Sequence, residues 1–153
     1  MKTLSMKIPL RSALPCALLA VALSASAQQM KIESQGEAAV DAQKEALVAM
    51  SMSKAIGLPV AGKGQVVFFR SSRSPGAALD IHADGKAVGE LPAGMYFAMP
   101  AAPGTHAYST GGAGPLSVAV MKDKTHYVQV IRDRAGHPQL LRSTAVKFQR
   151  ATR

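Results

Sequence analysis

Four histidines have the most evident capacity for chemistry in this sequence: His82, His106, His126 and His137. Imidazole nitrogens are common ligands of Zn²⁺ and Cu²⁺, and neighbouring strands could bring the first three together. No two of them have the short spacing of a His-x-His pair, however, and we expect surface or turn histidines. His106 follows Pro103-Gly104 and is expected to hydrogen-bond a backbone group of that turn. A small-ligand or metal-binding module remains the alternative hypothesis.

Methionine and the usual catalytic patterns offer less. Met50 and Met52 could present thioethers to copper(I), but residues two apart do not share a helix face. The chain has one cysteine, no G-x-S-x-G nucleophile elbow and nine scattered acids. The glycines of residues 111–114 precede neither a helix nor a Lys-Ser/Thr pair that could hold a phosphate. We therefore predict a protein that is not an enzyme, with no catalytic residue, no cofactor and no metal ion.

Residues 1–27 show the three parts of a secretory signal peptide in the right order. Basic residues precede an apolar run from Ala13 to Leu23, which is too short to span a bilayer, and Ala25-Ser26-Ala27 is a small-x-small cleavage signal. The sequence predicts cleavage after Ala27 and a periplasmic protein without a transmembrane segment after cleavage.

The single cysteine, Cys16, lies inside this apolar run. A lipid-anchor motif needs a small residue before the cysteine, where this chain has Pro15, so we expect an ordinary signal peptide and leave lipidation open. The mature chain then has no cysteine and no disulfide, a combination that suits a bacterial periplasm.

Positive charge is concentrated in the second part of the chain. Residues 63–153 carry twelve Lys and Arg against five acids, a net charge of +7. A basic surface attracts polyanions, and export by a signal peptide disfavours nucleic acid as the partner. We therefore expect an unidentified envelope protein or an anionic envelope polymer. The expected contact surface consists of five residues: Arg132, Arg134, Arg142, Lys147 and Arg150.

The elements that must position these residues begin with a helix. Residues 28–62 are interpreted as a polar lead-in, a helix over 36–56 and a Gly-rich joint. Gly57 and Pro59 should end the helix, and the lead-in from Met30 to Gln35 is expected to be disordered. Its narrow apolar stripe consists of Val40, Leu47 and Met50 or Ile56, and whether the helix docks on the rest of the chain stays open.

The strongest local signal is a β-hairpin centred on Asp84-Gly85, because both residues tolerate the positive φ that a two-residue turn needs. Such a turn pairs Ala83 with Lys86 and Ile81 with Val88. The next pair on that face would join Leu79 to Glu90, an apolar residue to a charged one. We therefore expect a bulge or a strand end near Gly89.

Short strands with turn signals between them occupy the rest of residues 63–153. Val66 to Phe69 is an uninterrupted apolar run, typical of a strand buried on both faces. Leu140 to Phe148 is expected to be the last strand. The pattern predicts an all-β fold, a small antiparallel β-sandwich of about seven strands with an Ig-like or PEGA-like arrangement.

The order of several short motifs resembles known envelope proteins. Asp84-Gly85, Val88-Gly89 and Pro103-Gly104-x-His106 resemble the PEGA-type pattern of extracytoplasmic β-sandwiches. With Gly94-x-Tyr96 and Lys124-x-x-Tyr127, residues 64–132 are similar to a bacterial family of envelope proteins of unknown function. The resemblance implies a small sandwich in the cell envelope with no known activity. We predict a secreted, non-enzymatic binding or structural module.

Overall fold

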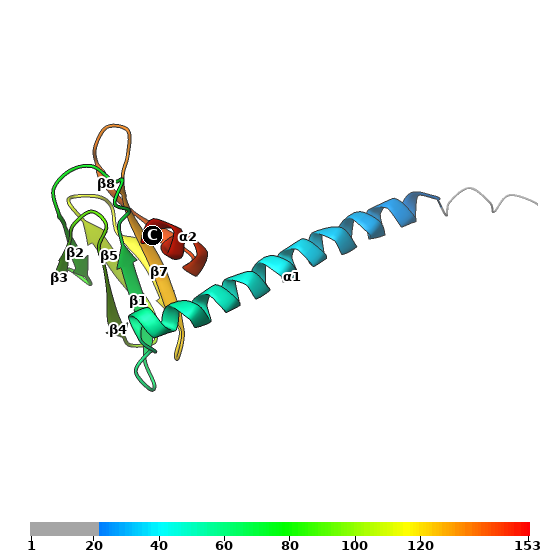
Figure 1. Ribbon diagram of the computed structural model, residues 1–153, viewed down its shortest axis with the longest axis horizontal. Helices are drawn as coiled ribbons and strands as arrows, with labels where there is room; N and C mark the ends of the chain where they lie inside the picture. Colours follow the sequence, from blue (N-terminus) through cyan, green and yellow to red (C-terminus); the bar gives the residue numbers. More distant parts are fainter. Residues whose placement is uncertain (1–21) are drawn as a thin grey trace, which may run out of the picture. The chain divides into compact units, whose positions relative to one another are not determined.

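The computed structural model describes the backbone of residues 22–153 and the side chains of residues 38–153. The predicted signal peptide lies largely outside this range, and its cleavage stays a prediction. The chain divides into two compact units, Met1–Val40 and Asp41–Arg153, of which the second holds all the strands. In chain order the elements are α1 (Ala22–Ile56), β1 (Gly64–Phe69), β2 (Leu79–Ala83), β3 (Lys86–Leu91), β4 (Tyr96–Ala101), β5 (Gly104–Thr110), β6 (Leu116–Val120), β7 (Thr125–Arg132), β8 (Pro138–Ser143) and α2 (Ala145–Ala151) (Figure 1).

The strands form two four-stranded sheets, in the orders β4-β1-β7-β8 and β3-β2-β5-β6. All neighbours pair antiparallel except β1 and β7, which run parallel. The prediction of a small antiparallel β-sandwich of about seven strands is confirmed in its coarse features, but the term all-β is wrong because one sheet is mixed and a second helix follows the strands. Over residues 22–153 the fold is mostly β, with eight strands in two sheets and two helices.

A shared core lies between the two sheets. Val66 and Phe68 of β1 project into it from the first sheet, and Ile81 and Tyr108 meet them from the second. Phe68 and Tyr108 pack edge to face, with their ring centroids 5.1 Å apart. The side chains that alternate with them along β1, Val67 and Phe69, face a second cluster on the outer side of the first sheet. Both faces of β1 are thus covered, as its uninterrupted apolar run predicts.

The Asp84-Gly85 hairpin forms as predicted near its turn, where both residues have positive φ and Ala83 pairs with Lys86. The predicted pair of Ile81 with Val88 is wrong, because the register shifts there and Ile81 pairs with Gly89. The extra residue is a β-bulge. It brings Leu91, rather than Glu90, opposite Leu79, and both leucines are buried. The bulge thus corrects the mismatch that the sequence showed.

Helix α1 ends at Ile56 as predicted, where Gly57 has a φ of 83° and its N–H bonds to the carbonyl of Ser53. Its start differs, since helix extends back to Ala22 through the segment expected to be disordered. None of the helices in the described part of the chain combines the length and apolarity needed for a bilayer span.

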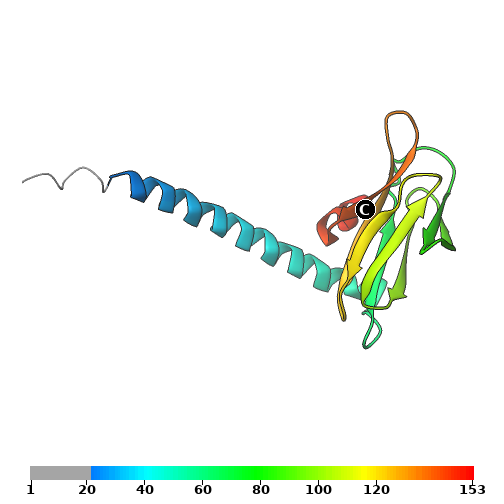
Figure 2. The ribbon, with the colours of Figure 1, turned by 180° about the vertical axis from the view of Figure 1, so that it is seen from behind.

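The face of α1 that packs within the second unit also differs from the prediction. Four residues pack against the outer cluster of the first sheet: Val48, Ala49, Met52 and Ile56. Figure 2 shows the last turns of α1, which carry them, beside the strands. These positions recur every three or four residues and share one helix face. Three residues of the expected stripe remain more than 60% exposed: Val40, Leu47 and Met50.

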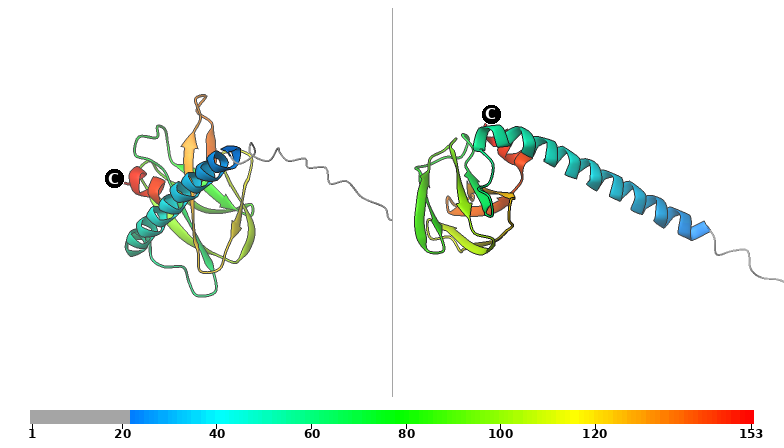
Figure 3. Two further views of the ribbon diagram at one scale, coloured as in Figure 1. Left: turned by 90° about the vertical axis from the view of Figure 1, so that its right-hand side faces the viewer. Right: turned by 90° about the horizontal axis from the view of Figure 1, so that it is seen from below.

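The chain ends in a helix rather than a strand, because β8 stops at Ser143 and α2 follows. Thr144 caps it, its hydroxyl accepting from the N–H of Lys147 at 3.3 Å. Ala145 and Phe148, three residues apart, are buried against the first sheet. The ring of Phe148 packs against three other aromatic rings, those of Phe69, Tyr96 and Tyr127. Figure 3 shows the helix α2, in red, beside the strands. Sequence alternation could not show that this apolar pair belongs to a helix.

Candidate functional site

The five predicted contact residues lie on three elements and one loop. Arg132 is the last residue of β7, Arg134 is in the β7–β8 loop, Arg142 is on β8, and Lys147 and Arg150 are on α2. Two of the five bind backbone within the domain. Arg132 donates from Nη1 to the carbonyl of Gly136 at 2.8 Å, and Arg142 donates from Nη2 to the carbonyl of Ser117 at 2.6 Å. The second bond ties β8 to β6 of the other sheet.

The remaining three, Arg134, Lys147 and Arg150, are exposed. Across residues 38–153 the ion pairs are His106–Asp84 and His137–Asp133, and neither involves a lysine or an arginine. The positive side chains of this surface therefore have no carboxylate partner within the described part of the chain.

The acids of residues 63–153 are used elsewhere. Carboxylate oxygens of Asp84, Asp123 and Asp133 accept backbone N–H groups, at 2.9, 3.3 and 2.8 Å. Asp80 and Glu90 face each other across β2 and β3 and are exposed on the second sheet. None of these five acids lies on β8 or α2, the elements that carry Arg142, Lys147 and Arg150.

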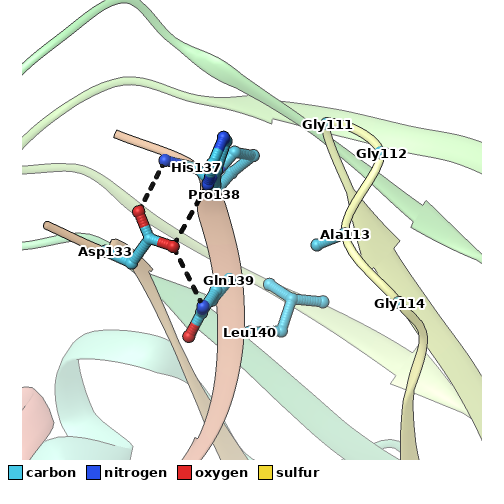
Figure 4. A pocket seen from close by; sticks show the side chains of 9 residues that line it. All are labelled: Gly111, Gly112, Ala113, Gly114, Asp133, His137, Pro138, Gln139 and Leu140. Atoms are coloured by element: carbon cyan, nitrogen blue, oxygen red, sulfur yellow. Dashed lines mark hydrogen bonds and ion pairs between the residues drawn. The ribbon is translucent and has the colours of Figure 1, made fainter. Parts of the chain in front are cut away.

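A pocket of about 430 Å³ opens between the 111–114 loop and the start of β8 (Figure 4). Asp133 is its charged member. One oxygen accepts from the N–H groups of Ala135 and His137, and the other lies 3.3 Å from Nδ1 of His137. These hydrogen bonds, led by the one from the His137 backbone, lower the pKa of Asp133. Both oxygens of the Asp133 carboxylate are therefore engaged within the β7–β8 loop, and this carboxylate stabilises the loop.

A second pocket of about 480 Å³ lies between α1 and the β6–β7–β8 edge. Its lining includes four ionisable residues: Glu45, His126, Tyr127 and Arg142. Burial and then the nearby Glu45 raise the pKa of Tyr127, and burial and then Arg142 lower the pKa of His126. Each charged group has an internal partner, because Glu45 accepts from the N–H groups of Ala145 and Val146. This pocket thus resembles a packing joint between helix and sheet.

The histidines do not converge. His82 and His106 lie in the second sheet, His126 lies in the first, and His137 is in the β7–β8 loop. Among the described residues, no three His, Cys, Asp or Glu side chains are placed to hold one metal ion. The prediction for His106 is confirmed, since its Nε2 lies 2.8 Å from the carbonyl oxygen of Ala102.

Arg70 is a buried charge that sequence reasoning missed. Its guanidinium makes five hydrogen bonds, four to backbone carbonyls and one to the hydroxyl of Ser74. The carbonyls belong to Pro75, Gly76, Ala77 and Leu91. The position of an arginine directly after a fully buried strand was the available signal. Its role is to fix the loop between β1 and β2.

Comparison with known proteins gives little further direction. No known family profile matches the chain, and no curated protein matches it. Among solved structures, the chain is similar to the N-terminal domain of AlgF from P. aeruginosa, with a TM-score of 0.40 and 18% identity. The match covers 55% of this chain and 96% of that one. This likeness is too distant to carry an argument about fold or function, and the PEGA-type resemblance stays a prediction.

Proposed function

We propose that this chain is a non-enzymatic β-sandwich module of the periplasm that contacts an anionic component of the cell envelope. The contact surface consists of the exposed basic side chains on β8, α2 and the β7–β8 loop. One observation carries the proposal: within residues 38–153, none of the lysines and arginines forms an ion pair with a carboxylate of that same range.

Uncompensated charge has a direct consequence for binding. Exposed cations hold a cloud of counter-anions, and a polyanion that displaces this cloud binds with an affinity that falls as salt rises. Phosphate-bearing or carboxylate-bearing envelope polymers supply such charge. Arg142 is held against Ser117 and Arg132 against Gly136, so these two guanidiniums present their charge in fixed positions.

The absence of catalysis is part of the proposal. The carboxylates of the two pockets, Asp133 and Glu45, accept backbone N–H groups of the domain. A general base or a nucleophile needs a free atom within hydrogen-bond reach of a substrate. Turnover of substrates from a broad hydrolase panel by the purified chain would contradict this part.

The binding test uses purified protein and isolated envelope fractions, with co-sedimentation measured at low and at high salt. The double variant Lys147→Gln, Arg150→Gln should bind several-fold more weakly and lose part of the salt dependence. The matched control, Arg73→Gln with Lys86→Gln, removes the same charge from exposed positions outside this surface. Equal binding of both double variants, or no binding of the unaltered chain, would overturn the proposal.

The pocket beside residues 111–114 supports a second candidate, a module for a small polar ligand. Its volume of about 430 Å³ falls within the range of small-molecule sites. A panel of sugars, amino acids and nucleotides, screened by thermal shift, tests this. A stabilising compound should lose its effect in Ala113→Trp, which fills the pocket.

A further inference from the structure

One end of the Asp41–Arg153 unit exposes large apolar side chains on two turns. Leu58 and Val60, in the joint between α1 and β1, are 77% and 55% exposed. Met121, in the β6–β7 turn, is 57% exposed. Strand β7 starts at this end and reaches the β7–β8 loop after eight residues, about 23 Å away. This surface, residues 57–63 and 121–124, is here named the apolar tip.

Hydrogen bonds join the two turns into one surface. The N–H of Asp123 donates to the carbonyl of Lys63 at 2.9 Å, and the N–H of Gly62 donates to the Asp123 carboxylate at 3.3 Å. The N–H of Gln65 also donates to the carbonyl of Lys124, at 2.9 Å. Both turns project from the same, lower end of the sheets (Figure 1).

Close packing behind the tip holds Met121 in place. A Cβ atom at Gly64 would lie 2.4 Å from Val120 Cγ1 and 2.5 Å from the Met121 carbonyl oxygen, so only glycine allows this approach. From the other side, Nε2 of His126 accepts the N–H of Met121 at 3.0 Å. The backbone that presents Met121 to solvent is therefore fixed by both neighbouring strands.

Lysines surround the apolar tip. Lys63, Lys122 and Lys124 lie on the two turns, and Lys54 is in the last turn of α1. All four are exposed. The acid within the tip, Asp123, accepts the N–H of Gly62 and so serves the contact between the turns. The tip thus combines exposed apolar side chains with a net positive charge.

We propose that the apolar tip docks on an anionic phospholipid bilayer. Leu58, Val60 and Met121 would enter the boundary between headgroups and acyl chains, where water no longer surrounds them. The lysine ammonium groups would stay at the level of the phosphates, since lysine buries its methylene stem and keeps its charge at the polar surface. The two features together select an anionic bilayer as the occupant, because its acyl layer takes the apolar side chains and its phosphates complement the lysines. This surface differs from the one assigned to polymer binding and does not depend on it.

A label at the tip tests insertion directly. The full chain carries Cys16→Ser and Met121→Cys, with an environment-sensitive fluorophore on the new thiol. Vesicles of phosphatidylglycerol and phosphatidylcholine should shift its emission to shorter wavelength, and vesicles of phosphatidylcholine alone should not. The same label at Ala135→Cys, in the loop at the other end of β7, should show no shift. An unshifted Met121→Cys label, or equal shifts at both positions, would overturn the proposal.

Charge and apolarity are tested separately by vesicle co-sedimentation. Lys63→Gln, Lys122→Gln and Lys124→Gln together should weaken binding to anionic vesicles by about a hundredfold. Leu58→Ser with Met121→Ser should weaken it about tenfold or more. The matched controls are Lys44→Gln, Arg73→Gln and Lys86→Gln together, and Leu47→Ser with Met95→Ser, all at exposed positions outside both proposed surfaces. Equal losses in tip variants and controls would contradict the tip as the site, whatever happens to polymer binding.

Discussion

The imidazole of His106 lies between two acceptors, with Nδ1 2.7 Å from Oδ2 of Asp84 and Nε2 2.8 Å from the carbonyl oxygen of Ala102. Both partners can only accept, so the two hydrogen bonds form together when both ring nitrogens carry a proton, as in an imidazolium. The other oxygen of Asp84 accepts the N–H of Ala107 at 2.9 Å. The pair therefore joins the β2–β3 turn to the start of β5.

This contact predicts a pH dependence of stability. The hydrogen bond that His106 donates to Asp84, followed by the one that it donates to the Ala102 carbonyl, raises the pKa of His106. The N–H of Ala107 and then the His106 ring, both donating to Asp84, lower the pKa of Asp84. The contribution of His106 is complete below its unfolded pKa of about 6.5 and is lost as pH rises through the raised value. That of Asp84 is present above about pH 4 and is lost as pH falls through the lowered value. The pair should stabilise most between these limits.

The check is urea unfolding at pH 5.5 and pH 8 for the unaltered chain and for His106→Gln. The unaltered chain should lose more of its unfolding free energy between these pH values than the variant does. An NMR titration should place the pKa of His106 above that of a histidine in a disordered peptide. An identical pH profile in both proteins would contradict the assignment.

His126 should respond in the opposite direction. Burial, followed by the charge of Arg142, lowers its pKa, and its Nε2 must be unprotonated to accept the N–H of Met121. Its contribution to stability is therefore complete above about pH 6.5 and is lost as pH falls through the lowered pKa. Acidification should speed amide exchange at Met121, measured after correction for intrinsic rates. The variant His126→Gln should show no such acid-dependent step, and a step that persists there would assign it to another group.

Glu45 should couple the end of α1 to the domain. Its two carboxylate oxygens accept the N–H groups of Ala145 and Val146, which the helix α2 cannot satisfy itself. Glu45→Ala should lower the unfolding free energy by about 1 to 2 kcal/mol. It should also increase proteolysis of residues 41–56. Glu45→Gln keeps one acceptor oxygen and should cost less, whereas an equal cost for both would indicate that packing, and not the hydrogen bond, joins the helices.

Arg70 should be the most sensitive charged position. Arg70→Met removes the donor to four backbone carbonyls in a buried site, and we expect a loss of about 3 kcal/mol or more. Arg70→Lys keeps the charge but has no planar fork to reach carbonyls on two sides, so it should recover part of the stability. The exposed Arg73→Met is the control, expected within about 0.5 kcal/mol of the unaltered chain. Denaturant unfolding measures all three, and a small loss for Arg70→Met would show that water replaces the guanidinium.

Features of the fold that depend on neighbouring residues were predictable. The Asp84-Gly85 turn follows from the φ values that these two residues accept, and the end of α1 follows from Gly57. The uninterrupted run Val66 to Phe69 indicated a strand covered on both faces. Even the bulge near Gly89 was foreshadowed, because an apolar residue cannot face Glu90 in a core. These are short-range effects of backbone sterics and side-chain polarity.

Features that depend on distant partners were decided by the tertiary structure. On α1, Glu45 accepts a hydrogen bond from the start of α2, and Met52 packs on the first sheet. These contacts determine which face of α1 docks, whereas the more apolar Leu47 stays exposed. The last segment became a helix because Phe148 fits among aromatic rings that come from three strands.

The two candidate surfaces also combine a property that the sequence predicts with positions that only the tertiary structure decides. The sequence by itself determined the excess of positive charge, which composition fixes, and the turns at Asp84-Gly85 and Gly57. Only the tertiary structure decided that Arg132 and Arg142 bind backbone, and that Leu58 and Met121 share one end of the molecule. The physical reason is that charge is a sum over residues, whereas a surface depends on which distant segments pack together.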